Sequence, residues 1–128
     1  CIVASKYPLY ILSALANKQN VIVHTGNLQD IEQATSAYLL GGMLGNIVKQ
    51  VCGQIKLKRV VIAGGDTSSY AARAMEIDAV EMIAPLVSGA PLCKAYSRNE
   101  MINGLEVNFK GGQVGAENYF EILLNGEL

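Results

Sequence analysis

A short apolar run that ends in two glycines constrains the fold of this chain most. Residues 60–63 read Val-Val-Ile-Ala, and Gly64 and Gly65 follow at once. A β-branched run of this length is typical of a strand buried on both faces, and the glycines end it. The next three residues can each cap a helix, and residues 69–75 have a helical composition. The stretch therefore predicts a strand, a glycine turn and the start of a helix.

The same arrangement suits the binding of phosphate. A strand–turn–helix unit directs several backbone N–H groups and the positive end of the helix dipole toward one point. Gly64 and Gly65 carry no side chain, so a ligand can come close to the backbone there. The alternative is an ordinary turn in which Asp66 only caps the helix.

A second glycine loop stands near the end of the chain. Residues 105–110 alternate apolar and polar side chains, which predicts a half-buried strand, and residues 116–124 have a helical pattern. The loop between them holds Lys110, Gly111, Gly112 and Gly115. A lysine is a compact charge often used against phosphate. The spacing fits neither a P-loop, where the lysine follows the glycines, nor the Gly-x-Gly motif of dinucleotide-binding folds.

Together these motifs resemble the four-carbon acid sugar kinase family. The run GGDTS after an apolar strand, a Gly-Ala-Pro turn at residues 89–91, the stretch LEVNFKGGQVG and then Tyr119-Phe120 match its C-terminal nucleotide-binding domain over about residues 35–120. The resemblance implies an ATP-dependent kinase acting on the terminal hydroxyl of four-carbon sugar acids such as threonate, erythronate or their 3-oxo forms. It also implies an N-terminal sugar-acid-binding domain as partner. We therefore expect residues 1–128 to be a single-domain fragment of a longer kinase.

Phosphoryl transfer by such an enzyme depends on positioned phosphates and Mg²⁺ more than on covalent chemistry from the protein. The predicted ATP-binding residues are Gly64, Gly65, Asp66, Thr67, Ser68, Lys110, Gly111, Gly112 and Gly115. Asp66 is expected to hold Mg²⁺ or orient a water, while Thr67 and Ser68 donate to phosphate through hydroxyl and N–H groups. Lys110 neutralises phosphate charge, unless it only forms a salt bridge at the strand end. No catalytic base is predicted, and we expect the chain alone to bind ATP weakly without turnover.

The rest of the chain predicts an α/β fold with a mixed, mostly parallel sheet flanked by helices in three layers. Further strands are predicted at residues 21–24, 77–83 and 92–96, with a strand stub at residues 1–5, and further helices at residues 7–15 and 28–55. An Asn-Gly turn at residues 103–104 predicts an antiparallel hairpin. Gly41 and Gly42 lie inside the longer helix, where they predict close packing of another element.

Composition restricts the classes of partner. The net charge of −1 gives no general attraction for nucleic acid, and no apolar run is long enough to cross a bilayer. The three cysteines lack the spacing of a metal site, which predicts reduced thiols in a cytoplasmic protein. The sequence does not determine the oligomeric state, and a homodimer is one of the alternatives.

Two other function classes compete with the kinase. The chain could be a non-catalytic ligand-binding or assembly module whose glycine loops are only tight turns. It could also be a different phosphate-ligand enzyme, such as a dinucleotide-dependent one, although Gly-x-Gly-x-x-Gly is missing. Titration with ATP–Mg²⁺ and with NAD separates these classes.

Overall fold

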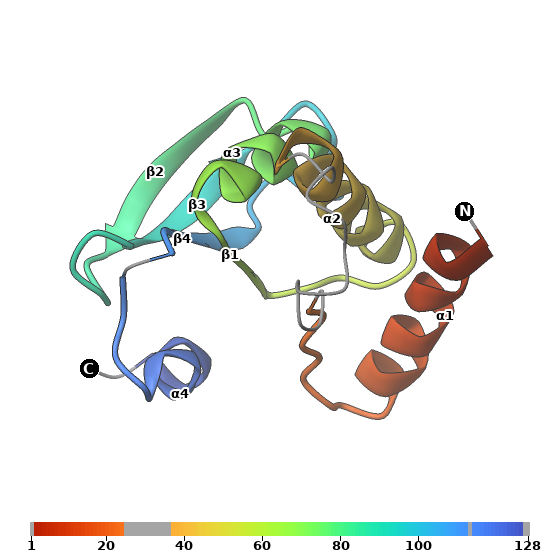
Figure 1. Ribbon diagram of the computed structural model, residues 1–128, viewed down its shortest axis with the longest axis horizontal. Helices are drawn as coiled ribbons and strands as arrows, with labels where there is room; N and C mark the ends of the chain where they lie inside the picture. Colours follow the sequence, from red (N-terminus) through yellow and green to blue (C-terminus); the bar gives the residue numbers. More distant parts are fainter. Residues whose placement is uncertain (1, 25–36, 113, 127–128) are drawn as a thin grey trace.

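A computed structural model describes residues 2–24, 37–112 and 114–126 of the chain. The elements are α1 (Ile2–Ala16), α2 (Ala37–Cys52), β1 (Arg59–Ala63), α3 (Gly65–Ala74), β2 (Ala79–Ala84), β3 (Leu92–Tyr96), β4 (Glu106–Lys110) and α4 (Tyr119–Asn125) (Figure 1). Within the described ranges no helix is long and apolar enough to span a bilayer.

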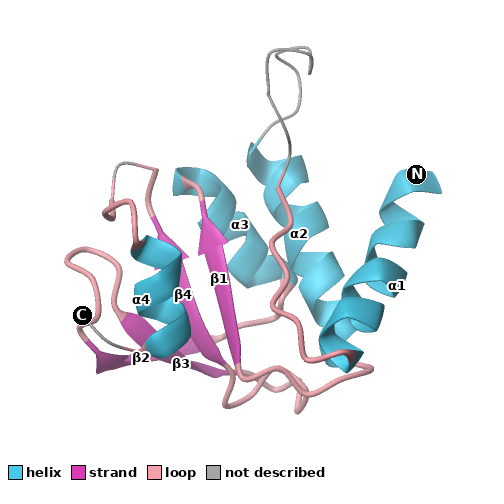
Figure 2. Cartoon of the chain, turned by 90° about the horizontal axis from the view of Figure 1, so that it is seen from below, coloured by secondary structure: helices cyan, strands magenta, loops and turns pink. Residues whose placement is uncertain are grey.

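The four strands form one sheet in the order β1-β4-β3-β2. β1 and β4 are parallel, whereas β4 with β3 and β3 with β2 are antiparallel. The sheet is mixed, as predicted, although parallel pairing is limited to one of these three pairs. The crossover from β1 to β4 places the ends of two strands that are distant in sequence beside each other (Figure 2).

Helices cover both faces of the sheet, which gives the predicted three layers. α3 packs on one face, where Ala71 and Met75 join Ile62 and Val107 in the main core. α4 packs on the other face, where Tyr119 and Leu123 meet residues of the strands and of the β2–β3 connection (Figure 1). α2 lies against α3, and α1 lies outside α2 (Figure 2).

Two glycines, Gly41 and Gly45, let α2 and α3 approach closely, so the predicted close packing is confirmed for Gly41 but is wrong for Gly42. A Cβ at Gly41 would lie 2.6 Å from the Thr67 carbonyl oxygen, and a Cβ at Gly45 would lie 2.5 Å from the Ala71 oxygen. Gly42 faces open space instead. The backbone of α2 therefore packs directly along α3, from Thr67 to Ala74.

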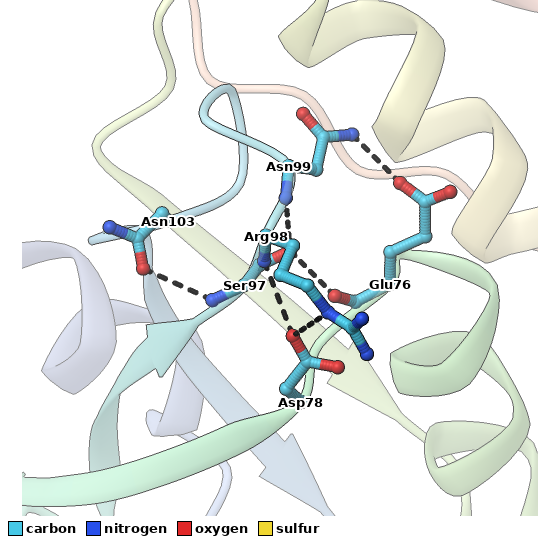
Figure 3. A network of polar contacts seen from close by, with 6 residues as sticks. All are labelled: Glu76, Asp78, Ser97, Arg98, Asn99 and Asn103. Atoms are coloured by element: carbon cyan, nitrogen blue, oxygen red, sulfur yellow. Dashed lines mark hydrogen bonds and ion pairs between the residues drawn. The ribbon is translucent and has the colours of Figure 1, made fainter.

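A polar network stabilises the end of the sheet at which β4 begins. Residues of the β3–β4 loop bond to the turn before β2: the Ser97 hydroxyl donates to the Glu76 carbonyl over 2.6 Å, and the Arg98 N–H donates to Asp78 over 3.2 Å. The Asn99 amide donates to the Glu76 carboxylate, and the Asn103 side chain accepts from the Ser97 N–H (Figure 3). This network lies at the amino end of β4, and it holds the predicted hairpin loop in place.

Several predicted boundaries are wrong. Residues 2–5 are helical and not a strand stub, because α1 continues on both sides of Pro8. Residues 21–24 form no strand, since Val21 packs against the helical cluster of Ile11, Ile47 and Val51. β1 consequently lies at an edge of the described sheet, so Val60 and Val61 are only half-buried, contrary to the predicted burial on both faces.

The predicted long helix ends early. α2 stops at Cys52, and the chain turns through Gly53 and Gln54 toward β1. Residues 28–36 of that prediction lie outside the described part of the chain.

Candidate functional site

The two glycine loops lie side by side. β1 and β4 run parallel and in register, with Ala63 opposite Lys110, so both strands end at the same edge of the sheet (Figure 2). The Gly64 N–H donates to the Lys110 carbonyl over 2.9 Å and joins the loops directly. This is the edge at which open α/β sheets bind ligands.

The first loop is shorter than predicted, because α3 begins at Gly65. Its N-cap residue is Gly64, whose φ of 131° is one that residues with a side chain rarely adopt. Asp66, Thr67 and Ser68 are therefore not caps but lie within the first turn. Helix geometry leaves the N–H groups of Gly65, Asp66 and Thr67 without a partner inside the helix. These N–H groups point out of the helix beside the second loop.

The three polar residues of this turn differ in how much of their surface is exposed to solvent. Asp66 is exposed, and Thr67 is half-buried beside Gly64. The Ser68 hydroxyl donates to the Gly65 carbonyl over 2.8 Å, and the Ser68 N–H donates to the Gly64 carbonyl. Ser68 thus supports the turn from within, whereas Asp66 faces solvent.

A small hollow continues from Asp66 along α3. Its volume is about 210 Å³, and its lining residues are Asp66, Ser69, Tyr70 and Arg73. The Arg73 guanidinium lies 5.9 Å from the Tyr70 ring centroid, and Tyr38 of α2 packs edge-on against the same ring. A larger hollow of about 340 Å³ lies between Lys56, Lys58 and Glu106 at the opposite ends of β1 and β4. We favour the smaller one as part of the site, since Asp66 of the first turn of α3 lines it.

The second loop begins with Lys110, which is half-buried. Its ammonium donates to the Gly111 carbonyl over 3.0 Å and lies 5.4 Å from the centre of the Tyr119 ring. Gly115 has a φ of 102°, and a Cβ there would lie 2.6 Å from the Tyr119 ring. Glycine is therefore required at residue 115 by both conformation and space. Gly111 and Gly112 leave their surroundings open, with at most an ordinary contact to Val114.

Sequence reasoning missed a buried polar pair beneath this loop. The Tyr119 hydroxyl donates to Asn108 Oδ1, and the Asn108 amide donates to the carbonyls of Ala90 and Pro91 over 2.8 and 3.1 Å. Both side chains are buried, although strand alternation placed Asn108 on an exposed face. Burial raises the pKa of Tyr119. The only sequence signal was the apolar pattern of the following helix, which covers that face.

The site offers few protein ligands for a metal. Across the described residues, no three His, Cys, Asp or Glu side chains gather closely enough to hold an ion. A magnesium ion at Asp66 would therefore take most of its ligands from phosphate oxygens and water, which is usual for Mg²⁺ with nucleotides. The exposed carboxylate beside a helix N-terminus fits such a shared ion.

Comparison with known proteins gives matching families and folds. Residues 6–120 match the family model described as a nucleotide-binding C-terminal domain. A 3-oxo-isoapionate kinase from Paraburkholderia graminis is 39% identical over 93 residues, which are 73% of this chain and 20% of that kinase. The chain thus spans about a fifth of the length of this curated relative.

Two solved structures are similar to this chain at low sequence identity. A Bordetella bronchiseptica protein with a domain of unknown function, crystallised with citrate as a domain-swapped dimer, has a TM-score of 0.61 at 20% identity. It covers 89% of this chain, which covers 28% of it. A Haemophilus influenzae protein has a TM-score of 0.65 at 17% identity, with 96% and 31% covered. Both carry the family designation DUF1537, and the likeness shows a shared fold.

Proposed function

This chain belongs to the nucleotide-binding C-terminal domain family, and we propose that it binds ATP for a four-carbon acid sugar kinase. The family membership confirms the resemblance to these kinases. The kinase would phosphorylate the terminal hydroxyl of a small sugar acid. Threonate, erythronate and their 3-oxo forms are the candidate substrates from the sequence, and 3-oxo-isoapionate is the one named for the 39% identical relative.

One observation carries the proposal: the N-terminus of α3 and Lys110 are adjacent. The contact of 2.9 Å between the Gly64 N–H and the Lys110 carbonyl holds the helix end and the lysine at one edge of the sheet. Oriented N–H groups at the start of α3, with a lysine at the end of the neighbouring strand, suit a chain of phosphates.

Each residue then has a defined task. The N–H groups of Gly65, Asp66 and Thr67 bind phosphate oxygens, and the Asp66 carboxylate shares a magnesium ion with them. Lys110 neutralises charge from the second loop, while Gly111 and Gly112 let the nucleotide approach the backbone. Ser68 keeps the first turn in shape through the Gly65 carbonyl.

The acceptor side is proposed to come from a partner domain. No side chain that we assign to the site is a convincing base for the sugar hydroxyl, since Asp66 is better used at the metal. We therefore propose that a sugar-acid-binding domain supplies the base and closes over the phosphates, as domain closure does in many kinases.

Calorimetric titration of the chain with ATP–Mg²⁺ tests this proposal. We expect binding of ATP and weaker or no binding of NAD. Lys110→Met should lower the affinity about tenfold, the order expected for one lost charged contact. Lys94→Met is the matched control, because Lys94 also lies over a tyrosine ring but at the other end of the sheet. Binding of neither nucleotide would favour the assembly module. An equal loss of ATP affinity in both variants would show that Lys110 has no specific role in nucleotide binding.

A further inference from the structure

We propose that Tyr119, held by the buried Asn108, is the positioning residue of the second glycine loop and sets where Lys110 and Gly115 meet the phosphates. The proposal rests on the proposed nucleotide site, but it concerns residues that neither glycine loop contains. Tyr119 is the first residue of α4, and Asn108 lies in β4, two residues before Lys110.

The ring of Tyr119 contacts the loop at both of its ends. At the far end the ring packs against Gly115, where a Cβ would lie 2.6 Å from Cδ2 of the ring. At the near end the Lys110 ammonium lies 5.4 Å from the ring centre, within the range of a cation–π interaction. The same ammonium donates to the Gly111 carbonyl. One aromatic ring therefore fixes the lysine and the exit of the loop together.

The hydroxyl group fixes the ring in turn. It donates to Asn108, whose amide donates to the carbonyls of Ala90 and Pro91. All of these polar atoms are paired in a region where Asn108 has no exposed surface. A buried, fully paired network specifies one geometry more than it adds stability. The ring therefore cannot shift out of this position without breaking a buried hydrogen bond.

The same network ties the loop to the turn before β3. Ala90 and Pro91 belong to this turn, and a Cβ at Gly89 would lie 3.7 Å from a methyl group of Val114 in the loop. The turn is therefore connected to the second glycine loop in two ways. Asn108 of β4 bonds to the carbonyls of the turn, and Val114 of the loop lies beside Gly89. This rigid base is what a loop needs to present a cation and backbone groups at fixed positions.

A second tyrosine of similar chemistry provides the control. The Lys94 ammonium lies 5.5 Å from the Tyr96 ring, and the Tyr96 hydroxyl bonds to a carboxylate, Glu81. This pair lies on β3 near the amino end of β4, away from both loops. If any lysine–tyrosine pair affected the fold equally, Tyr96→Leu and Tyr119→Leu would change nucleotide binding alike.

The test is a double-mutant cycle on ATP–Mg²⁺ binding with a separate readout of the loop. We expect Tyr119→Leu to weaken binding about fivefold. Tyr119→Phe keeps the ring but removes the hydrogen bond to Asn108, and it should weaken binding by a smaller but measurable factor. Lys110→Met should cost less affinity in the Tyr119→Leu background than in the wild-type chain, because the lysine is already misplaced. Without nucleotide, amide exchange of residues 111–112 and 114–116 should accelerate in Tyr119→Leu, while that of β3 stays unchanged.

Several results would overturn the inference. Unchanged ATP affinity in Tyr119→Leu, or strictly additive effects of the Lys110 and Tyr119 substitutions, would contradict it while leaving the proposed function intact. Faster exchange across the whole sheet in Tyr119→Leu, together with wild-type ATP affinity in Tyr119→Phe, would show a structural role only. A wild-type chain that binds no ATP would refute the proposed function and this role together.

Discussion

The contact between α2 and α3 gives a sharp prediction, because two glycines of one helix face opposite environments. Gly45 lies against α3, where an added Cβ would be 2.5 Å from the Ala71 oxygen and 2.6 Å from the Ala74 Cβ. Gly42 has nothing within 4 Å of the same added atom. Both residues lie inside α2 and neither has a positive φ, so alanine suits the backbone equally at both.

The expected changes in the free energy of unfolding have opposite signs. Alanine gains about 1 kcal/mol over glycine inside a helix, and Gly42→Ala should be more stable by roughly that amount. At residue 45 the same gain is opposed by overpacking, which costs about 3 kcal/mol when a backbone oxygen must move. Gly45→Ala should therefore lose about 2 kcal/mol net. The two variants should differ by about 3 kcal/mol, or roughly 10 °C in Tm for a domain of this size.

Urea unfolding followed by far-ultraviolet circular dichroism measures both variants against the wild-type chain. Equal m-values would show that the change is in stability and not in the compactness of either state. If both alanines stabilise the chain, α2 does not rest on α3 as the structure has it, and the position of the α3 N-terminus is then unsupported.

Further predictions concern the site and its supports. Asp66→Ala should lower the rate of a full-length kinase by tenfold or more, about the cost of one transition-state contact, with little change in Tm; equal losses would make Asp66 a structural residue. Gly115→Ala should weaken ATP binding, since its φ of 102° and the Tyr119 ring both exclude a Cβ; unchanged binding would contradict the loop geometry. Arg59→Met should destabilise the chain by about 2 kcal/mol in urea, because the Arg59 guanidinium bonds to Glu106 over 2.7 Å and to a carbonyl of α4; a neutral result would contradict this role. Burial raises the pKa of the Cys52 thiol, so its contribution to stability is present below pH 9 and is lost as the pH rises through the folded-state pKa. The free energy of unfolding should therefore fall less steeply at alkaline pH in Cys52→Ala than in the wild-type chain. Identical slopes would contradict the burial of this thiol.

The central unit of the fold followed from local chemistry. The apolar run before Gly64 forms β1, and the strand predicted at residues 92–96 is β3 without change. Both predictions rested on β-branched or alternating residues bounded by turn residues, which act within a few positions. The two glycine loops are adjacent because β1 and β4 are parallel and end at one edge of the sheet.

Features that depend on distant packing were not predictable in this way. Residues 21–24 have the composition of a strand, but Val21 packs on the helices instead. Asn108 looked exposed because strand alternation says nothing of a helix that later covers the second face. Tyr119 entered the family motif without a role, since only the folded chain places its ring under Lys110.

Titration of the isotope-labelled chain with ATP–Mg²⁺, followed by amide NMR, tests directly whether both glycine loops bind nucleotide. We expect the amides of Gly65, Asp66 and Thr67 to shift together with those of Gly111 and Gly112, with one common dissociation constant. Shifts confined to a single loop, or none in either, would contradict the claim that both loops bind one chain of phosphates.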